Sequence, residues 1–197
     1  MRHPEPPADP AKVRPLIKRF ACAWFRIHAK SLHVLHFGSQ PRHRFDAPGG
    51  EFGVLYVGRD AHCAFIETFG HVTGRVPFVT ETELRARNLA IMRASEALRL
   101  VDLRGEGLVH IGADSELTSG TDYGLSRRWA AALYNHPRQP DGIVYRARHD
   151  PARTSAAIFD RAGPKLATSL EGSLLDSKHE RLLGDILDTY GYGLVPS

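Results

Sequence analysis

A short apolar strand that leads directly into a helix start is the feature that most restricts the fold of this chain. Residues 53–58 read Gly-Val-Leu-Tyr-Val-Gly, a glycine-bounded run rich in strand-forming residues. Asp60 follows as a suitable helix N-cap, and apolar residues then recur at helical spacing up to Phe69. Glu67 lies outside that apolar stripe. We therefore expect a strand followed by a helix, with Glu67 on a different face from Phe65.

The remaining pattern mixes helices and strands irregularly. Strands are predicted at residues 98–103, 108–111, 142–145 and 155–160, and helices at 122–136 and 182–190. Residues 16–28 have nearly helical spacing before an extended end, and residues 84–92 fit either a short helix or a loop. Neither a Gly-x-Gly-x-x-Gly turn nor a P-loop is present, and there is no regular βαβ rhythm. This pattern predicts an α+β fold, a single domain with a central mixed or antiparallel sheet.

The length and composition are those of one soluble domain. The chain has 197 residues, of which 42% are hydrophobic, and no apolar run is long enough for a membrane span. Residues 1–15 are rich in proline and charge, so we expect a flexible tail rather than a secretory signal, followed by one domain at 16–197. Cys22 and Cys63 are the two cysteines, which favours reduced thiols and a cytoplasmic location. The amphipathic helix near the C-terminus packs on its own core or contacts a second copy, which leaves a homo-oligomer possible.

The net charge of +4 gives little support for a nucleic-acid partner. Lysines and arginines are dispersed along the chain, without a basic stripe interleaved with aromatics. The nearest cluster, Arg146, Arg148 and Arg153, is either a solvated loop or a surface for a pyrophosphate or an acidic partner. Direct nucleic-acid binding is the least favoured of the functions considered, and steeply salt-sensitive binding to any duplex would indicate it.

Three residue types around the first strand suggest a site for an anionic sugar nucleotide. Arg44 precedes a Pro-Gly-Gly turn, Tyr56 lies in the strand and Glu67 in the helix. An arginine grips phosphate, an aromatic ring stacks on a planar base, and a carboxylate stabilises the positive centre that forms when a glycosidic bond breaks. By spacing alone, a solvated arginine, a core tyrosine and a helix-surface glutamate are the favoured interpretation of the same residues.

Several short motifs, in order, resemble the RES domain family, the toxin components of bacterial RES–Xre toxin–antitoxin pairs. The resemblance covers most of the chain, about residues 20–165. The segments that carry it are Trp24–His28, Arg44–Pro48, the strand with Tyr56, Ala64–Phe69, Trp129–Ala130, Asp141–Arg146 and Ala157–Arg161.

The resemblance implies an ADP-ribosyltransferase-like fold that acts on NAD as a substrate, with no other cofactor. No metal is expected, because the histidines lack a His-Glu-x-x-His or paired Cys/His spacing. Arg26 and Arg44 match NAD-binding arginines of the family, Tyr56 its aromatic site residue and Glu67 its catalytic glutamate; Arg26 and Tyr56 are counted with the catalytic set. The implied activity is cleavage of the nicotinamide–ribose bond by hydrolysis or phosphorolysis, neutralised by an Xre-type antitoxin. ADP-ribosylation of a protein target is the alternative.

One position departs from the family pattern. The family serine is expected in a Tyr-x-Ser-x-x-Asp-Pro motif, and here Ala147 stands in its place. Loss of one hydroxyl weakens binding by about 0.5–1.5 kcal/mol, roughly tenfold rather than completely. Ser126, Thr154 and Ser155 are possible substitutes. A weakened relative that serves as a binding module therefore stays open as a further alternative.

Overall fold

The computed structural model describes residues 4–71 and 77–196, and its centre is a strongly curved eight-stranded sheet. The strand order is β1-β6-β7-β8-β3-β2-β5-β9, with β6 and β7 parallel and the other neighbouring pairs of this sheet antiparallel. Its strands are β1 (Ile17–Phe20), β2 (Trp24–Ala29), β3 (Val54–Gly58), β5 (Arg87–Ala94), β6 (Leu98–Asp102), β7 (Gly142–Arg146), β8 (Thr154–Phe159) and β9 (Leu166–Gly172). A separate parallel pair joins β4 (Phe78–Thr80) to β10 (Gly193–Val195).

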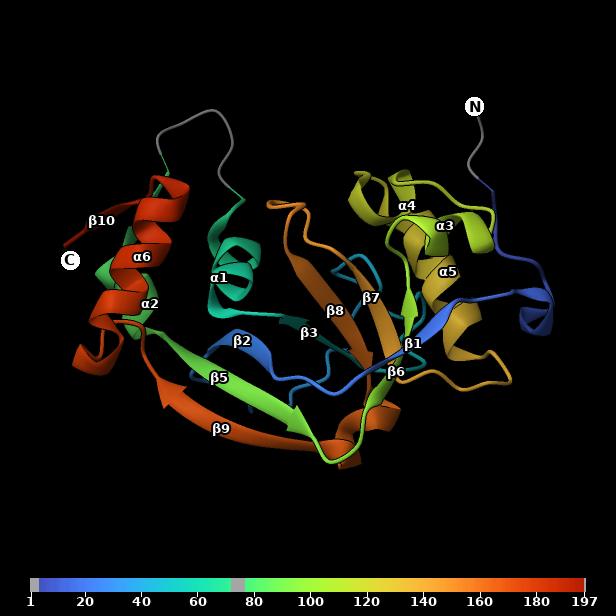
Figure 1. The fold of residues 1–197 in the computed structure, drawn as a ribbon, viewed down its shortest axis with the longest axis horizontal. Coiled ribbons are helices and arrows are strands. Elements are labelled where there is room, and N and C mark those ends of the chain that lie inside the picture. The colour runs from blue at the N-terminus through green and yellow to red at the C-terminus, as the bar shows by residue number, and fades with distance from the viewer. Residues whose placement is uncertain (1–3, 72–76, 197) are drawn as a thin grey trace.

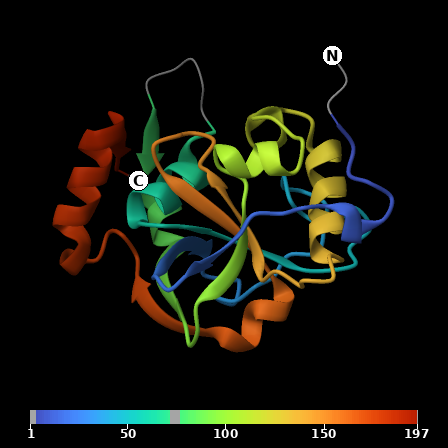
Figure 2. The same ribbon diagram turned by 45° about the vertical axis from the view of Figure 1, so that its right-hand side comes forward.

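Helices gather at the two ends of this sheet, with one helix between the groups (Figure 1). The helices are α1 (Ala61–Phe69), α2 (Glu81–Arg85), α3 (Glu106–His110), α4 (Glu116–Ser119), α5 (Tyr123–Tyr134) and α6 (Glu180–Tyr190). Short 3-10 turns occur at Pro10–Lys12, Asp160–Lys165 and Ser177–His179. Helices α2 and α6 lie at the end that holds the C-terminus, α3 to α5 at the end that holds the N-terminus, and α1 between them; a view turned by 45° keeps the same order (Figure 2). The predicted α+β class with a mixed sheet is confirmed.

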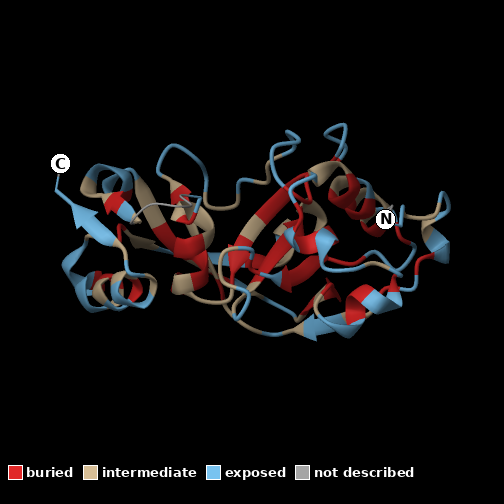
Figure 3. Cartoon of the chain, turned by 90° about the horizontal axis from the view of Figure 1, so that it is seen from above, coloured by how far each residue is buried: buried red, intermediate tan, exposed pale blue. Residues whose placement is uncertain are grey.

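The core consists of three packed clusters of buried residues. One lies under α5 around Trp129 and Phe159, one surrounds Trp24 and Leu100, and one joins α1 to α6 around Phe65. Buried residues fill the middle of the molecule, whereas β10 is exposed along its length (Figure 3). No helix within residues 4–71 and 77–196 has the length and apolar character needed to cross a lipid bilayer.

The strand and helix at residues 54–69 form as predicted, and the reasons are local. The Asp60 carboxylate accepts a hydrogen bond from the Cys63 backbone N–H at 2.7 Å and so caps α1. Gly58 lets the strand end run directly beneath this helix, because a Cβ there would lie 2.8 Å from the Ala64 nitrogen. Strands β6, β7 and β8 and helices α5 and α6 are also confirmed. Asp122 caps α5, and Gly191 ends α6 with a φ of 63°.

Three segments differ from the sequence prediction. Residues 16–28 form strands β1 and β2 rather than a helix with an extended end, because both strands are held by long-range pairing to β6 and β5. Residues 108–111, predicted as extended, belong mainly to α3. Residues 84–92 are neither a helix nor a loop throughout, since α2 ends at Arg85 and β5 begins at Arg87.

The first described residues lie along α5. The Pro4 carbonyl accepts a hydrogen bond from the Trp129 indole at 3.0 Å, and Glu5 forms an ion pair with Arg128 at 2.7 Å. The Val13 carbonyl is hydrogen-bonded to the buried His136 ring at 3.2 Å. Flexibility of residues 1–15 stays a prediction.

Cys22 and Cys63 are both free thiols, as predicted.

Candidate active site

The residues predicted for the site meet in one pocket of about 250 Å³ above the middle of the sheet. Strands β2 and β3, helix α1 and the loop between β7 and β8 form its walls, with Tyr123 at the start of α5 on one side. The residues that line it are Phe25, Arg26, Ile27, His43, Arg44, Tyr56, Val57, Gly58, Ala64, Glu67, Thr68, His71, Tyr123, Tyr145, Arg148, His149 and Ser155. All four predicted site residues are therefore brought together, from segments far apart in the sequence.

Glu67 is a largely buried carboxylate at the pocket wall. Its Oε1 accepts a hydrogen bond from the His149 backbone N–H at 3.2 Å. Burial raises the pKa of Glu67, and the backbone N–H groups of His149 and Arg148, followed by the nearby His71 and Arg44, oppose that rise. A carboxylate held by backbone donors keeps a defined position and stays available to a ligand hydroxyl or a developing cation.

Arg44 is a buried cation whose two terminal nitrogens have no hydrogen-bond partner among the described residues. Its side chain is only 6% exposed, and both terminal nitrogens are buried without a hydrogen bond. The guanidinium stacks over the Tyr123 ring at 4.7 Å from the centroid, and burial lowers its pKa. Because buried donors nearly always have partners, this orphaned guanidinium indicates a site for an anionic ligand group.

Tyr56 supports the loop that carries Arg44. Its hydroxyl donates to the Asp46 carboxylate at 2.9 Å and accepts from the Phe45 backbone N–H at 2.9 Å. Asp46, 1% exposed, also accepts from the backbone N–H groups of Arg42 and His43. The Tyr56 hydroxyl is thus committed to the loop, and only its ring is offered to the pocket. Asp46 had no assigned role in the sequence, although it lies within the Arg44–Pro48 motif.

Arg26 on β2 is the second arginine of the pocket. Its Nη1 donates to the carbonyls of Val34 at 2.7 Å and His36 at 3.2 Å, and burial lowers its pKa to about 10. Among the residues that the structure describes, no ion pair joins Arg26 or Arg44 to a carboxylate. The two guanidiniums therefore carry positive charge that no direct ion pair neutralises, although Glu67 lies close enough to Arg44 for their charges to interact.

The loop between β7 and β8 adds Arg148 and His149 to the pocket, neither of which is among the four residues assigned to the site from the sequence. Arg148 donates to the Tyr123 hydroxyl at 3.0 Å, and the His149 ring lies edge-on to His71 at 5.1 Å. The basic cluster noted in the sequence is thus divided: Arg148 faces the pocket, whereas Arg146 is exposed and Arg153 binds Asp60. The signal in the sequence that points to this loop is its position next to Ala147, where the family serine is expected.

Of the three hydroxyls considered in place of the missing serine, one lines the pocket. Ser155 is 2% exposed, and its hydroxyl forms a hydrogen bond with the Cys63 thiol at 3.3 Å. Ser126 instead donates to the Leu117 carbonyl, and Thr154 accepts from Arg104. Burial raises the pKa of Cys63 to about 11, which makes this thiol a poor nucleophile.

The arrangement fits recognition of an anionic ligand with a sugar hydroxyl. Uncompensated guanidiniums suit phosphate oxygens, and the rings of Tyr56 and Tyr123 offer flat apolar faces. The single pocket carboxylate, Glu67, lies close enough to Arg44 for their charges to interact. Within the described part of the chain, no group of three His, Cys, Asp or Glu side chains could hold a metal ion.

Comparison with known proteins gives three findings. The family model of the RES domain matches residues 23–182. The chain is 33% identical over 113 residues to probable toxin y4kH of Sinorhizobium fredii (strain NBRC 101917 / NGR234), an alignment that covers 57% of this chain and 87% of that protein. A chain in the crystal structure of the M. tuberculosis MbcT–MbcA toxin–antitoxin complex matches with a TM-score of 0.64 and 14% identity, over 87% of this chain and 95% of that one. This last likeness concerns the fold alone.

Proposed function

Because this chain belongs to the RES domain family, we propose that it is a toxin enzyme that consumes NAD by cleaving the bond between nicotinamide and ribose. The observation that carries the proposal is the pairing, in one pocket, of a buried guanidinium whose terminal nitrogens lack hydrogen-bond partners among the described residues (Arg44) and a largely buried carboxylate held by backbone donors (Glu67). Such a pair suits a substrate with negative phosphates at one end and a developing positive charge at the other.

The chemistry assigns a role to each predicted residue. Arg44 and Arg26 hold the diphosphate, and the Tyr56 ring packs against the nicotinamide or the ribose. Ionised Glu67 accepts a hydrogen bond from a ribose hydroxyl and stabilises the oxocarbenium character of the sugar. As the glycosidic bond breaks, its electron pair goes to the pyridinium nitrogen, so nicotinamide leaves neutral without an acid catalyst. A volume of about 250 Å³ is small for a whole dinucleotide, so the adenosine half extends over the rim.

The acceptor is water or phosphate, which defines hydrolysis or phosphorolysis. In hydrolysis, water attacks the ribose carbon and loses a proton to solvent; in phosphorolysis, inorganic phosphate forms the new bond. Transfer of ADP-ribose to a protein target is the second candidate, and a binding module weakened by Ala147 the third.

A protein antitoxin is the proposed partner. The kinship with a probable toxin and the likeness to a chain from a toxin–antitoxin complex support it. The family resemblance suggests an Xre-type antitoxin and action in the cytoplasm, where NAD is available.

Expression in a bacterium, with cellular NAD and growth as readouts, tests the proposal against a Glu67→Gln variant. This substitution keeps the side-chain size and removes the charge, so we expect NAD loss with the wild type and at least a hundredfold slower loss with the variant, on the order of the effect of removing one electrostatic stabiliser. Equal NAD loss in both would refute the role of Glu67.

Purified protein then separates the candidate reactions. A rate that rises with added phosphate identifies phosphorolysis, and a phosphate-independent rate identifies hydrolysis. Intact NAD in the presence of folded wild type refutes both. In that case, labelled NAD added to cell extract tests for ADP-ribosyl transfer, and gain of activity in Ala147→Ser identifies a weakened relative.

A further inference from the structure

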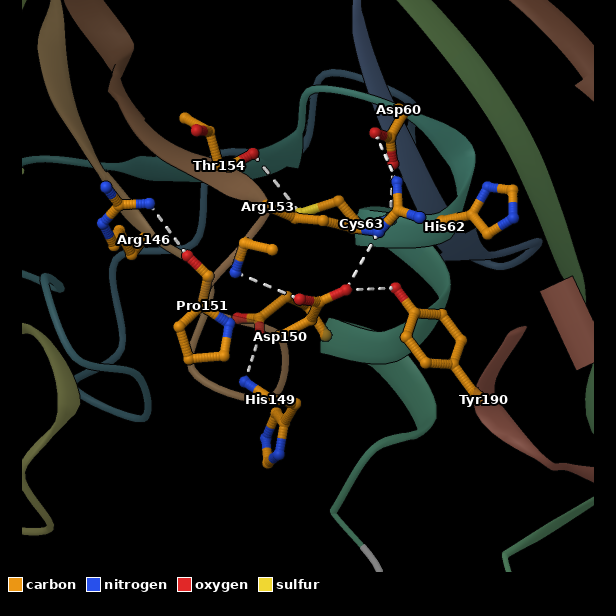
Figure 4. Close-up of polar contacts among 12 residues, drawn as sticks. Asp60, His62, Cys63, Arg146, His149, Asp150, Pro151, Arg153, Thr154 and Tyr190 are labelled. Carbon is orange, nitrogen blue, oxygen red and sulfur yellow. Dashed lines mark hydrogen bonds and ion pairs between the residues drawn. The ribbon is translucent and has the colours of Figure 1, made fainter.

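The loop between β7 and β8, residues 147–153, is clamped by a network of charged and polar side chains (Figure 4). The Asp150 carboxylate accepts from Arg153 Nε at 3.0 Å and from the Ala152 backbone N–H at 3.1 Å. Arg153 continues to Asp60, with its Nη1 2.7 Å from that carboxylate. Asp60 in turn caps α1. The loop is thereby tied to the start of the helix that carries Glu67.

The C-terminal helix α6 contributes a third anchor to the same network. The Tyr190 hydroxyl donates to Asp150 Oδ2 at 2.9 Å, and the Arg153 guanidinium lies 5.9 Å from the centre of the Tyr190 ring. Figure 4 shows the tyrosine pointing from α6 toward Asp150, across α1. Burial and the Asp150 carboxylate raise the pKa of Tyr190, so the hydroxyl keeps the proton that it donates.

The same loop delivers the backbone donors to Glu67. His149 directly precedes Asp150, and its N–H donates to Glu67 Oε1 at 3.2 Å. Asp150 accepts further hydrogen bonds within the loop, and the Arg153 backbone N–H donates to the Asp150 carbonyl at 2.9 Å. A side chain fixed one residue away from a donor restricts where that donor points. The contacts therefore form a continuous path from Tyr190 through Asp150 and His149 to Glu67.

We propose that Tyr190 and Asp150 are positioning residues for the active site: helix α6, through the Tyr190–Asp150 hydrogen bond, fixes the loop whose His149 N–H aligns the Glu67 carboxylate. The part of this inference that concerns turnover rests on the proposed NAD-consuming function. The positioning itself is a property of the protein without substrate.

The proposal has a consequence that a purely structural tyrosine would lack. If the loop loosens, the His149 N–H donates less to Glu67, and the charged form of that carboxylate loses stabilisation. Its pKa then rises further. The groups that face Glu67 from the surrounding elements are Arg44, Cys63, His71, Tyr145, Arg148 and His149. The substitution Tyr190→Phe changes none of these charges, so it reports on positioning alone.

The first test is an NMR titration of the Glu67 side-chain carboxyl carbon in the wild type, Tyr190→Phe and Tyr134→Phe. Tyr134 is the matched control, because its hydroxyl also donates to an aspartate, Asp160 at 3.2 Å, outside the pocket. We expect a higher titration midpoint for Glu67 in Tyr190→Phe only, with faster hydrogen exchange of the His149 amide. An unchanged midpoint and unchanged exchange in folded Tyr190→Phe would overturn the proposal. If that variant does not fold, Asp150→Asn with the same exchange readout replaces it.

The second test measures NAD turnover against pH. Tyr190→Phe should lower kcat by about threefold to tenfold, with a smaller change in KM and an acid limb moved to higher pH. Turnover in Tyr190→Phe equal to that in Tyr134→Phe would overturn the catalytic part of the proposal. A wild type that consumes no NAD refutes the proposed function instead, and the NMR titration still decides the positioning.

Discussion

Arg44 offers a prediction in which stability and function move in opposite directions. Its guanidinium is buried, and neither terminal nitrogen has a hydrogen-bond partner among the described residues, so the protein carries a buried charge without a direct ion pair. Each unsatisfied buried donor group costs about 1–3 kcal/mol. Stacking of the guanidinium on the Tyr123 ring offsets about 0.5–2 kcal/mol of that cost. Replacement by methionine, an apolar side chain of similar length, should therefore raise the free energy of unfolding by about 1–3 kcal/mol.

Urea unfolding of the purified protein measures this change, and Arg104→Met is the contrasting control. Arg104 forms a direct ion pair: its Nε lies 2.8 Å from the Asp102 carboxylate, and the side chain of Asp102 is 2% exposed. Its removal leaves Asp102 with less compensation, so we expect a loss of about 1–2 kcal/mol for a partly exposed pair. On the proposed function, Arg44→Met should also abolish NAD consumption, since it removes a guanidinium proposed to bind phosphate.

The reasoning fails if Arg44→Met lowers the free energy of unfolding as Arg104→Met does. That result would mean that Arg44 has stabilising partners in solution, and the argument for an anion site at its guanidinium would be lost. A stabilised variant that still consumes NAD at the wild-type rate would instead show that the substrate phosphates bind elsewhere.

Two further predictions concern neighbouring residues. Tyr56→Phe leaves the Phe45 N–H without its acceptor and removes one hydrogen-bond donor from Asp46. The free energy of unfolding, measured in urea, should therefore fall by about 1–2 kcal/mol. An unchanged free energy of unfolding would contradict the role of Tyr56 in supporting the loop that carries Arg44. Glu67 has a raised pKa in the folded state, so its ionisation destabilises the fold as the pH rises through that pKa. Glu67→Gln should therefore be more stable than the wild type at pH 7, and the difference should vanish below pH 4.5. Urea unfolding across this pH range measures the difference in the free energy of unfolding, and a constant difference would refute the prediction.

Elements with local signals could be predicted from the sequence, and elements held by distant partners could not. Helices α1 and α5 have an aspartate cap, and α6 has a left-handed glycine stop, all of which act within a few residues. Strand β1 has no such signal, because its conformation comes from pairing with β6. In that pairing Ile17 lies opposite Val101, which follows more than 80 residues later in the sequence. Strand β9, whose middle residues are exposed, lacks the alternating pattern of a half-buried strand and was not anticipated.

The site follows the same division. Arg26, Arg44, Tyr56 and Glu67 were identified through short motifs, and the structure brings them into one pocket. The backbone donor to Glu67 could not be predicted, because every residue except proline has an N–H group and the loop that places this one is fixed by tertiary contacts. Nor could the sequence show which hydroxyl faces the pocket, since Ser155 and Thr154 are neighbours on β8 that point to opposite faces of the sheet.

The strand order has a consequence for when the site can exist. Strand β3 lies between β2, which precedes it, and β8, which follows about a hundred residues later. Pocket residues therefore span the chain from Phe25 to Ser155. At a synthesis rate of about 5–20 residues per second, the last of them leaves the ribosome on the order of ten seconds after the first. On the proposed function, the growing chain therefore consumes no NAD through most of translation, and activity begins only once the late strands have joined the sheet.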